Sequence, residues 1–107
     1  MQLPSNPTLT DIQTYVKEQC KQRGWDERSD VERIMLLTEE VGELAKEVRK
    51  HAGKFGYRKP ASSDALGDEL VDVFNWLVDI ANANDIDLET AFRRKWAKTD
   101  ARTWDIA

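Results

Sequence analysis

The residues with the clearest chemical potential are two pairs of carboxylates, each pair spaced three residues apart. Glu40 and Glu43 form the first pair, and Glu69 and Asp72 form the second. On an α-helix, residues three apart lie on the same side, so each pair would present its carboxylates together. Both pairs border apolar residues, which predicts that they flank a packing surface. If two such helices pack antiparallel, the four carboxylates converge and repel one another.

A hard divalent cation would relieve this repulsion. Magnesium prefers oxygen ligands in near-octahedral geometry and keeps several waters, so it can also accept phosphate oxygens. Gly42 lies between the acids of the first pair, where a mid-helix glycine costs up to about 1 kcal/mol relative to alanine and so indicates a packing or ligand-approach role. The alternative is a solvated acidic face, with Glu40 or Glu43 paired to Lys46 or Lys50.

Four predicted helices position these acids. Capping patterns start the first helix at Thr8 and the second at Ser29, and Asp87 is a good cap for the fourth. No segment shows the β-branched alternation of a strand. The expected helices cover residues 9–23, 30–51, about 62 or 63 to the turn at 82–85, and 87–98. We therefore expect an all-α protein, an antiparallel bundle of about four helices in a single domain spanning residues 1–107.

The third predicted helix is apolar around much of its circumference. Its apolar residues include Leu66, Leu70, Val73, Phe74 and Leu77. A helix of this kind is normally surrounded on several sides. Because the chain is short and has few faces of its own to cover this helix, we expect oligomerisation into a homodimer or homotetramer.

The composition of the chain and the motifs that it lacks argue against several classes of protein. The net charge of −4 argues against a binder of nucleic-acid polymers. No apolar run approaches the roughly 18 residues that span a membrane, and the N-terminus lacks the pattern of a secretory signal. The single cysteine, Cys20, cannot form an internal disulfide, which fits a reducing, cytoplasmic location. The sequence also lacks a GxxxxGK[ST] loop, and its one histidine, His51, cannot complete a di-iron or usual zinc site.

The acidic segments resemble a known signature. Glu39-Glu40-Val41-Gly42-Glu43, followed after 25 residues (44–68) by Glu69-Leu70-Val71-Asp72, is similar to the EExxE…ExxD motif of the MazG-type all-α nucleotide pyrophosphohydrolases. The preceding Arg23-Gly24-Trp25-Asp26 also resembles that family, and the similarity extends from about Thr10 to Trp104. It implies hydrolysis of a nucleoside triphosphate between its α- and β-phosphates, which releases the monophosphate and pyrophosphate.

The same resemblance implies roles for the acids. Glu40, Glu43, Glu69 and Asp72 would hold Mg²⁺, with Mn²⁺ as a substitute. Glu39 or Glu43 would orient or deprotonate the attacking water, and the sequence leaves this choice open.

Substrate contacts are expected from aromatic and cationic residues. Trp25 and Trp76 could stack a base, because stacking suits any flat ring, and by the resemblance Asn75 lies near a base-reading or ribose position. Lys95 and Arg102 match the ends of a KxxxNxxR-like run of the family, although Thr99 replaces its asparagine, and Lys54 lies in the central cationic loop. Packing is the alternative role for both tryptophans. Trp96 and Trp104 are expected to anchor the core or a subunit interface.

The resulting prediction is a magnesium-dependent nucleoside triphosphate pyrophosphohydrolase of the cytoplasm, acting in nucleotide-pool cleansing. Three alternatives remain open at this stage. Two are related activities, that of a dimeric dUTPase-like enzyme and that of a phosphoribosyl-ATP pyrophosphohydrolase. The third is a non-catalytic helical module that assembles with another protein.

Overall fold

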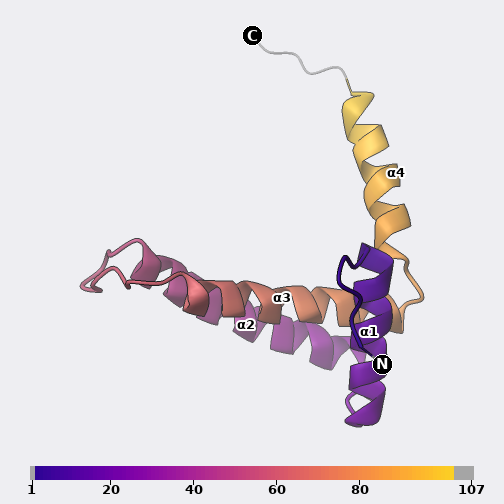
Figure 1. The fold of residues 1–107 in the computed structure, drawn as a ribbon, viewed down its shortest axis with the longest axis horizontal. Helices are drawn as coiled ribbons and strands as arrows, with labels where there is room; N and C mark the ends of the chain where they lie inside the picture. Colours follow the sequence, from indigo (N-terminus) through magenta and orange to yellow (C-terminus); the bar gives the residue numbers. More distant parts are fainter. Residues whose placement is uncertain (1, 103–107) are drawn as a thin grey trace.

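The computed structural model describes residues 2–102, and this part of the chain forms four helices and no strand (Figure 1). The helices are α1 (Leu9–Gln22), α2 (Asp30–His51), α3 (Asp64–Ala83) and α4 (Leu88–Asp100). The predicted all-α fold of four helices is confirmed, with bounds that differ from the predicted ones by about two residues at most. None of the described helices is both long enough and apolar enough to cross a membrane.

Side-chain caps define where α1, α2 and α4 begin, and at α4 the Asp87 carboxylate accepts from the Thr90 amide. At α1 the Thr8 hydroxyl accepts from the amide of Asp11, whose carboxylate accepts from the Thr8 amide in return. Ser29 and Glu32 repeat this reciprocal arrangement at α2. Such caps satisfy amides that have no partner within the helix, so the sequence pattern fixes these two starting points locally.

The four helices form a hairpin with two further helices at one end. α2 and α3 run antiparallel along their length, and the loop that joins them lies at the far end of the hairpin (Figure 1). α1 crosses the other end of the hairpin and packs against α3, whereas α4 leads away from it and packs against α1. The antiparallel hairpin is the element that brings the two acidic segments together.

The small core lies where α1 crosses the hairpin. Val78 and Ala81 of α3 are buried there, and Gln13 of α1 is buried beside them. The Gln13 amide donates to the side chain of Asn82 at 3.1 Å and to the carbonyl of Ile86 at 2.8 Å, and it accepts from the amide of Leu88 at 2.6 Å. One uncharged side chain therefore joins α1, the end of α3 and the start of α4.

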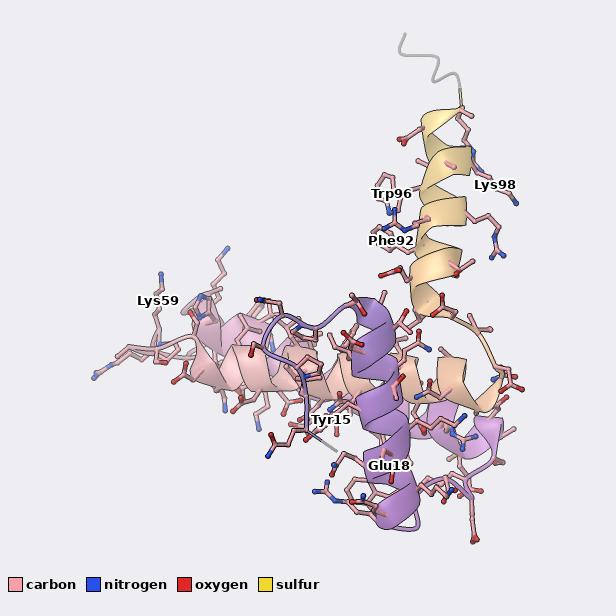
Figure 2. The ribbon with its side chains drawn as sticks, turned by 45° about the vertical axis from the view of Figure 1, so that its right-hand side comes forward. Tyr15, Glu18, Lys59, Phe92, Trp96 and Lys98 are labelled. Carbon is pink, nitrogen blue, oxygen red and sulfur yellow. The ribbon has the colours of Figure 1, made fainter. Side chains whose placement is uncertain are left out.

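Much apolar surface of the hairpin and of α4 is uncovered in the single chain. Exposed apolar side chains lie on α2 (Val31, Ile34, Met35, Val41, Val48), on α3 (Leu70, Val71, Phe74, Leu77) and on α4 (Phe92, Trp96). Phe92 and Trp96 project from the same side of α4, and Lys98 projects from the opposite side (Figure 2). The broad apolar arc predicted for the third helix is thus only partly covered by the other helices.

Candidate active site

Three of the predicted metal-binding carboxylates meet between α2 and α3. Glu40 of α2 and Glu69 and Asp72 of α3 each place one carboxylate oxygen so that the three atoms lie within 4.8 Å of one another. Glu40 and Glu69 are half-buried and Asp72 is exposed. The spacing of three residues puts Glu69 and Asp72 on one side of α3, and the antiparallel hairpin sets Glu40 opposite them.

The cluster holds more negative charge than its surroundings neutralise. Loss of solvation raises the pKa of Glu69, and the neighbouring carboxylate of Glu40 raises it further, followed by the charges of Asp72 and Glu43. The Oε2 atom of Glu69 is buried and has no hydrogen-bond partner among the described residues. A buried acceptor without a donor, next to other acids, matches the donor set of a hard divalent cation.

The other two acids of the first motif lie at the margin. The charge of Glu43 reaches Glu69, but Glu43 is exposed and does not belong to the group of three converging oxygens. Glu39, one position before Glu40, is exposed on a different side of α2. The structure therefore brings three of the four predicted ligands together and sets Glu43 beside them.

A cavity of about 500 Å³ adjoins the cluster. Glu40 and Asp72 form part of its wall, so the acids face this space. Its lining combines acids, cations, aromatic rings and amides from α1, the α1–α2 turn, α2 and α3: Tyr15, Val16, Gln19, Cys20, Arg23, Trp25, Arg28, Glu40, Asp72, Asn75, Trp76 and Asp79. Trp25, Asn75 and Trp76, which the sequence suggested as substrate contacts, all belong to this set.

Two tryptophans and two arginines form a stacked group in the wall of the cavity. The Arg28 guanidinium carbon lies 5.2 Å from the ring centroid of Trp76 and 6.0 Å from that of Trp25, so Arg28 spans both rings. Arg23 lies 5.1 Å from the Trp25 centroid. Gly24, with φ +70°, allows the chain to turn so that the Trp25 amide donates back to the Cys20 carbonyl at 2.8 Å. This turn joins the backbone of Trp25 to the last turn of α1.

A buried ion pair supports the same wall. The Arg33 Nε atom of α2 donates to Asp79 Oδ2 of α3 at 2.9 Å, and Arg33 also contacts Asp30 and the Asp26 carbonyl, each at 3.2 Å. Burial alone would lower the pKa of Arg33, but its bonds to Asp79 and Asp30 raise it. Burial also raises the pKa of the half-buried Cys20 thiol, and the Asp79 carboxylate raises it further.

The remaining predicted substrate contacts do not line the cavity. Lys54 lies in the loop at the far end of the hairpin, Lys95 lies on α4, and Arg102 follows α4. Trp96 is exposed on α4, and Trp104 falls outside the described residues. Within the single chain, therefore, Arg23 and Arg28 are the cations that lie in the cavity wall.

Sequence reasoning gave no role at the site to Arg28, Asp79 or Gln19. Arg28 stands three residues after Trp25, a spacing that suggests contact only once the intervening turn is known. Asp79 continues the acidic face of α3 beyond Trp76, which is a signal that the helical periodicity did contain. Gln19 belongs to α1, and its placement depends on how α1 crosses the hairpin.

Sequence comparison relates this arrangement to known proteins. A family profile described as the MazG nucleotide pyrophosphohydrolase domain matches residues 29–106. The uncharacterized protein YpjD of Bacillus subtilis (strain 168) is 35% identical over 101 residues, which covers 94% of this chain and 91% of YpjD. The uncharacterized protein YvdC of the same strain is 28% identical over 102 residues, covering 88% and 94% of the two chains.

Two crystal structures share the fold. That of YpjD from Bacillus subtilis superposes with a TM-score of 0.77 at 37% identity and covers 94% of this chain and 100% of its own. The Bacillus-conserved MazG protein, a nucleotide pyrophosphohydrolase, superposes with a TM-score of 0.76 at 31% identity and covers 96% and 100%. The similarity in both structures extends over the helices that carry the carboxylate cluster.

Proposed function

Because the chain belongs to the MazG nucleotide pyrophosphohydrolase family, we propose that it hydrolyses ribo- or deoxyribonucleoside triphosphates to the monophosphate and pyrophosphate. One observation carries the proposal: the convergence of Glu40, Glu69 and Asp72 beside a cavity that also holds two tryptophans and two arginines. Carboxylates suit a divalent cation, arginines suit phosphates and flat rings suit a base. A nucleoside triphosphate offers all three kinds of group.

The residues of the cluster fit a magnesium ion. Glu40, Glu69 and Asp72 would hold it, with Glu43 as a further ligand within reach of the same charges. The orphaned buried oxygen of Glu69 and the mutual repulsion of the acids support this assignment. When bound, the ion would neutralise the triphosphate and polarise its α-phosphate. Mn²⁺ would substitute, because it takes the same oxygen ligands.

The reaction requires a water and an acceptor for its proton. The water oxygen forms a bond to the α-phosphorus, the bond from this phosphorus to the bridging oxygen breaks, and pyrophosphate leaves with that oxygen. The proton passes to a carboxylate and then to solvent. Glu43 suits this role better than Glu39, because its charge acts on Glu69 whereas Glu39 is exposed elsewhere on α2.

The cavity wall would bind the rest of the nucleotide. Trp25 and Trp76 would stack the base, and Asn75 would hydrogen-bond to the base or sugar. Arg28 lies against both rings, so an entering base would displace its guanidinium towards the phosphates. There Arg28 and Arg23 would pair with the triphosphate and steady the leaving pyrophosphate.

A second copy of the chain would complete the molecule. The radius of gyration is 17.1 Å, compared with about 13 Å for a compact domain of this length, and the uncovered apolar residues of the hairpin and of α4 require cover. We infer a homodimer or homotetramer in which Phe92 and Trp96 pack on a neighbouring chain. In such an assembly Lys54, Lys95 and Arg102 would reach phosphates only at the neighbour's site.

The proposed physiological role is removal of unwanted nucleotides from the cytoplasmic pool. It follows from the reaction, which destroys the triphosphate and leaves the monophosphate for reuse. The test is pyrophosphate release from a panel of canonical and modified nucleoside triphosphates, dUTP and phosphoribosyl-ATP, with magnesium and with chelator.

Two substitutions sharpen this experiment. Glu69→Gln removes one charge from the cluster at constant shape, and Asp68→Asn makes the matched change at the exposed neighbouring position. We expect magnesium-dependent release of pyrophosphate together with monophosphate, lost in the first variant and retained in the second. Activity confined to dUTP or to phosphoribosyl-ATP would redirect the substrate assignment. Silence across the panel, with magnesium present, would refute the enzyme and favour a non-catalytic assembly module.

A further inference from the structure

Asp79 is an acid of the cavity wall that the proposed reaction does not use. Asp79 is only 8% exposed, yet it lines the cavity together with Trp76 and Cys20. It follows Asp72 by seven residues on α3, a rise of about 10 Å along the helix. The cavity therefore has an acid of the cation-binding cluster, Asp72, in its wall, and a second acid, Asp79, two helical turns further along α3, beyond the tryptophan that would stack the base.

The Asp79 carboxylate is fixed in orientation. Arg33 Nε donates to its Oδ2 atom at 2.9 Å, and Arg33 is itself held by Asp30 and the Asp26 carbonyl. A carboxylate offers about four acceptor positions on two oxygens. Among the described residues, the Arg33 Nε atom donates to Asp79 Oδ2, and the Cys20 thiol adds a weak hydrogen bond to the same carboxylate. Asp79 thus retains acceptor capacity on a wall that faces the cavity.

An acceptor-only group in a largely desolvated wall distinguishes ligands by what they donate. Cytosine and adenine carry an exocyclic amino group where uracil and hypoxanthine carry a carbonyl oxygen. The amino group donates a hydrogen bond to a carboxylate. A carbonyl oxygen at the same place would repel the carboxylate and leave its oxygen without a hydrogen-bond donor. The neighbouring amides of Asn75 and Gln19 both donate and accept, so they do not impose this choice.

We propose that Asp79, oriented by Arg33, accepts a hydrogen bond from the exocyclic amino group of a base stacked at Trp25 and Trp76, so that the cavity prefers amino-bearing bases to their oxo counterparts. The proposal rests on the proposed function in one respect, namely that the ligand is a nucleotide. The ion pair with Arg33 uses the Oδ2 atom, and Asp79 lines the cavity as well.

The first experiment measures binding without catalysis. Quenching of tryptophan fluorescence is titrated with CMP against UMP and with AMP against IMP, in the presence of magnesium, on the full chain. In the wild type we expect the amino-bearing member of each pair that binds to do so roughly 10- to 100-fold more tightly, the range that a hydrogen bond to a charged group supplies. Equal affinities, tighter binding of the oxo member, or no binding of any of the four would overturn the proposal.

Variants separate base recognition from a structural role. Asp79→Asn adds a donor at the same shape and is expected to bring each affinity ratio towards one. The matched control, Asp85→Asn, changes an exposed aspartate beyond α3 that does not line the cavity, and its ratios should equal those of the wild type. If Asp79→Asn lowers the melting temperature but leaves the ratios unchanged, the residue is structural only. If this variant fails to fold, the wild-type affinities still test the proposal: a preference for the amino-bearing base supports it, and equal affinities overturn it.

The proposal and the proposed function fail in distinguishable ways. Pyrophosphate release at equal rates from CTP and UTP and from ATP and ITP would leave the enzyme in place and overturn the role of Asp79. Selective binding of the amino-bearing monophosphates without any pyrophosphate release would leave the role of Asp79 in place and refute the hydrolase.

Discussion

The ion pair between Arg33 and Asp79 should contribute more to stability than any other charge contact of the described chain. The side chains of Arg33 and Asp79 are 6% and 11% exposed and meet at 2.9 Å. Substituting Asp79 by alanine leaves a buried guanidinium without its main partner. Removal of one member of a buried pair costs about 3–5 kcal/mol, and we expect the lower end, because Arg33 keeps its contacts with Asp30 and the Asp26 carbonyl.

The chain supplies its own comparison. Asp30 contacts the same guanidinium at 3.2 Å, but its side chain is 56% exposed, so Asp30→Ala should cost about 1 kcal/mol or less. For a domain of this size, a loss of about 3 kcal/mol lowers the melting temperature by roughly 10–20 °C. The double variant Arg33→Met with Asp79→Leu replaces the pair by apolar groups, so it should lose less than the sum of the two single variants.

The assay is equilibrium unfolding in urea followed by far-ultraviolet circular dichroism. All variants are compared at one protein concentration, because association shifts apparent stability. A cost for Asp79→Ala no larger than that for Asp30→Ala would refute the argument from burial. Strict additivity in the double variant would show that the two charges do not act on one another.

Three further predictions concern the acids. Magnesium or manganese should raise the melting temperature of the wild type, because a ligand that binds only the folded state stabilises it, and an equal shift in Glu69→Gln would contradict the site. In the presence of chelator, the free energy of unfolding should fall as the pH rises from 4.5, the ordinary pKa of a glutamate, towards the raised pKa of Glu69, because in this range the folded chain holds a proton that the unfolded chain has released. In Glu69→Gln, a series of melting temperatures over the same pH range should not show this fall. Hydrogen bonds from the side chain and amide of Thr90 lower the pKa of Asp87 below 3.8, so its stabilisation of α4 is present above that pH and is lost as the pH falls through the lowered value. Circular dichroism should therefore show a loss of helicity for the wild type as the pH falls below 3.8, and Asp87→Ala should lack this part of the loss.

Local sequence rules were sufficient for the helices and for the facing acids. The caps at Thr8, Ser29 and Asp87 involve residues three apart, so they could be read without any tertiary information. The pairing of Glu69 with Asp72 follows from helical spacing, and their meeting with Glu40 follows from two consecutive helices that pack antiparallel. The caps and the pairing of Glu69 with Asp72 depend on short-range geometry, which the sequence specifies directly, and the meeting with Glu40 adds only the packing of two helices that follow one another in the chain.

The cavity depends on long-range packing and was only partly predictable. Trp25 and Trp76 were expected to bind substrate, but the arginine that spans their rings was not, because its position depends on the turn after α1 and on how α1 crosses the hairpin. The path of α4 was equally open. Its spacing of apolar residues predicts a packed face but does not say whether that face meets its own chain or another, and within this chain it is uncovered.

The hydrogen bonds of Gln13 have a consequence for how this protein can diverge. The buried Gln13 amide ties α1 to the end of α3 and the start of α4, and α1 contributes Tyr15, Val16, Gln19 and Cys20 to the cavity lining. A substitution at position 13 could thus widen or narrow the cavity while every residue that touches a ligand stays the same. Substrate range could drift among descendants of this chain through a position that an inspection of the site alone would overlook.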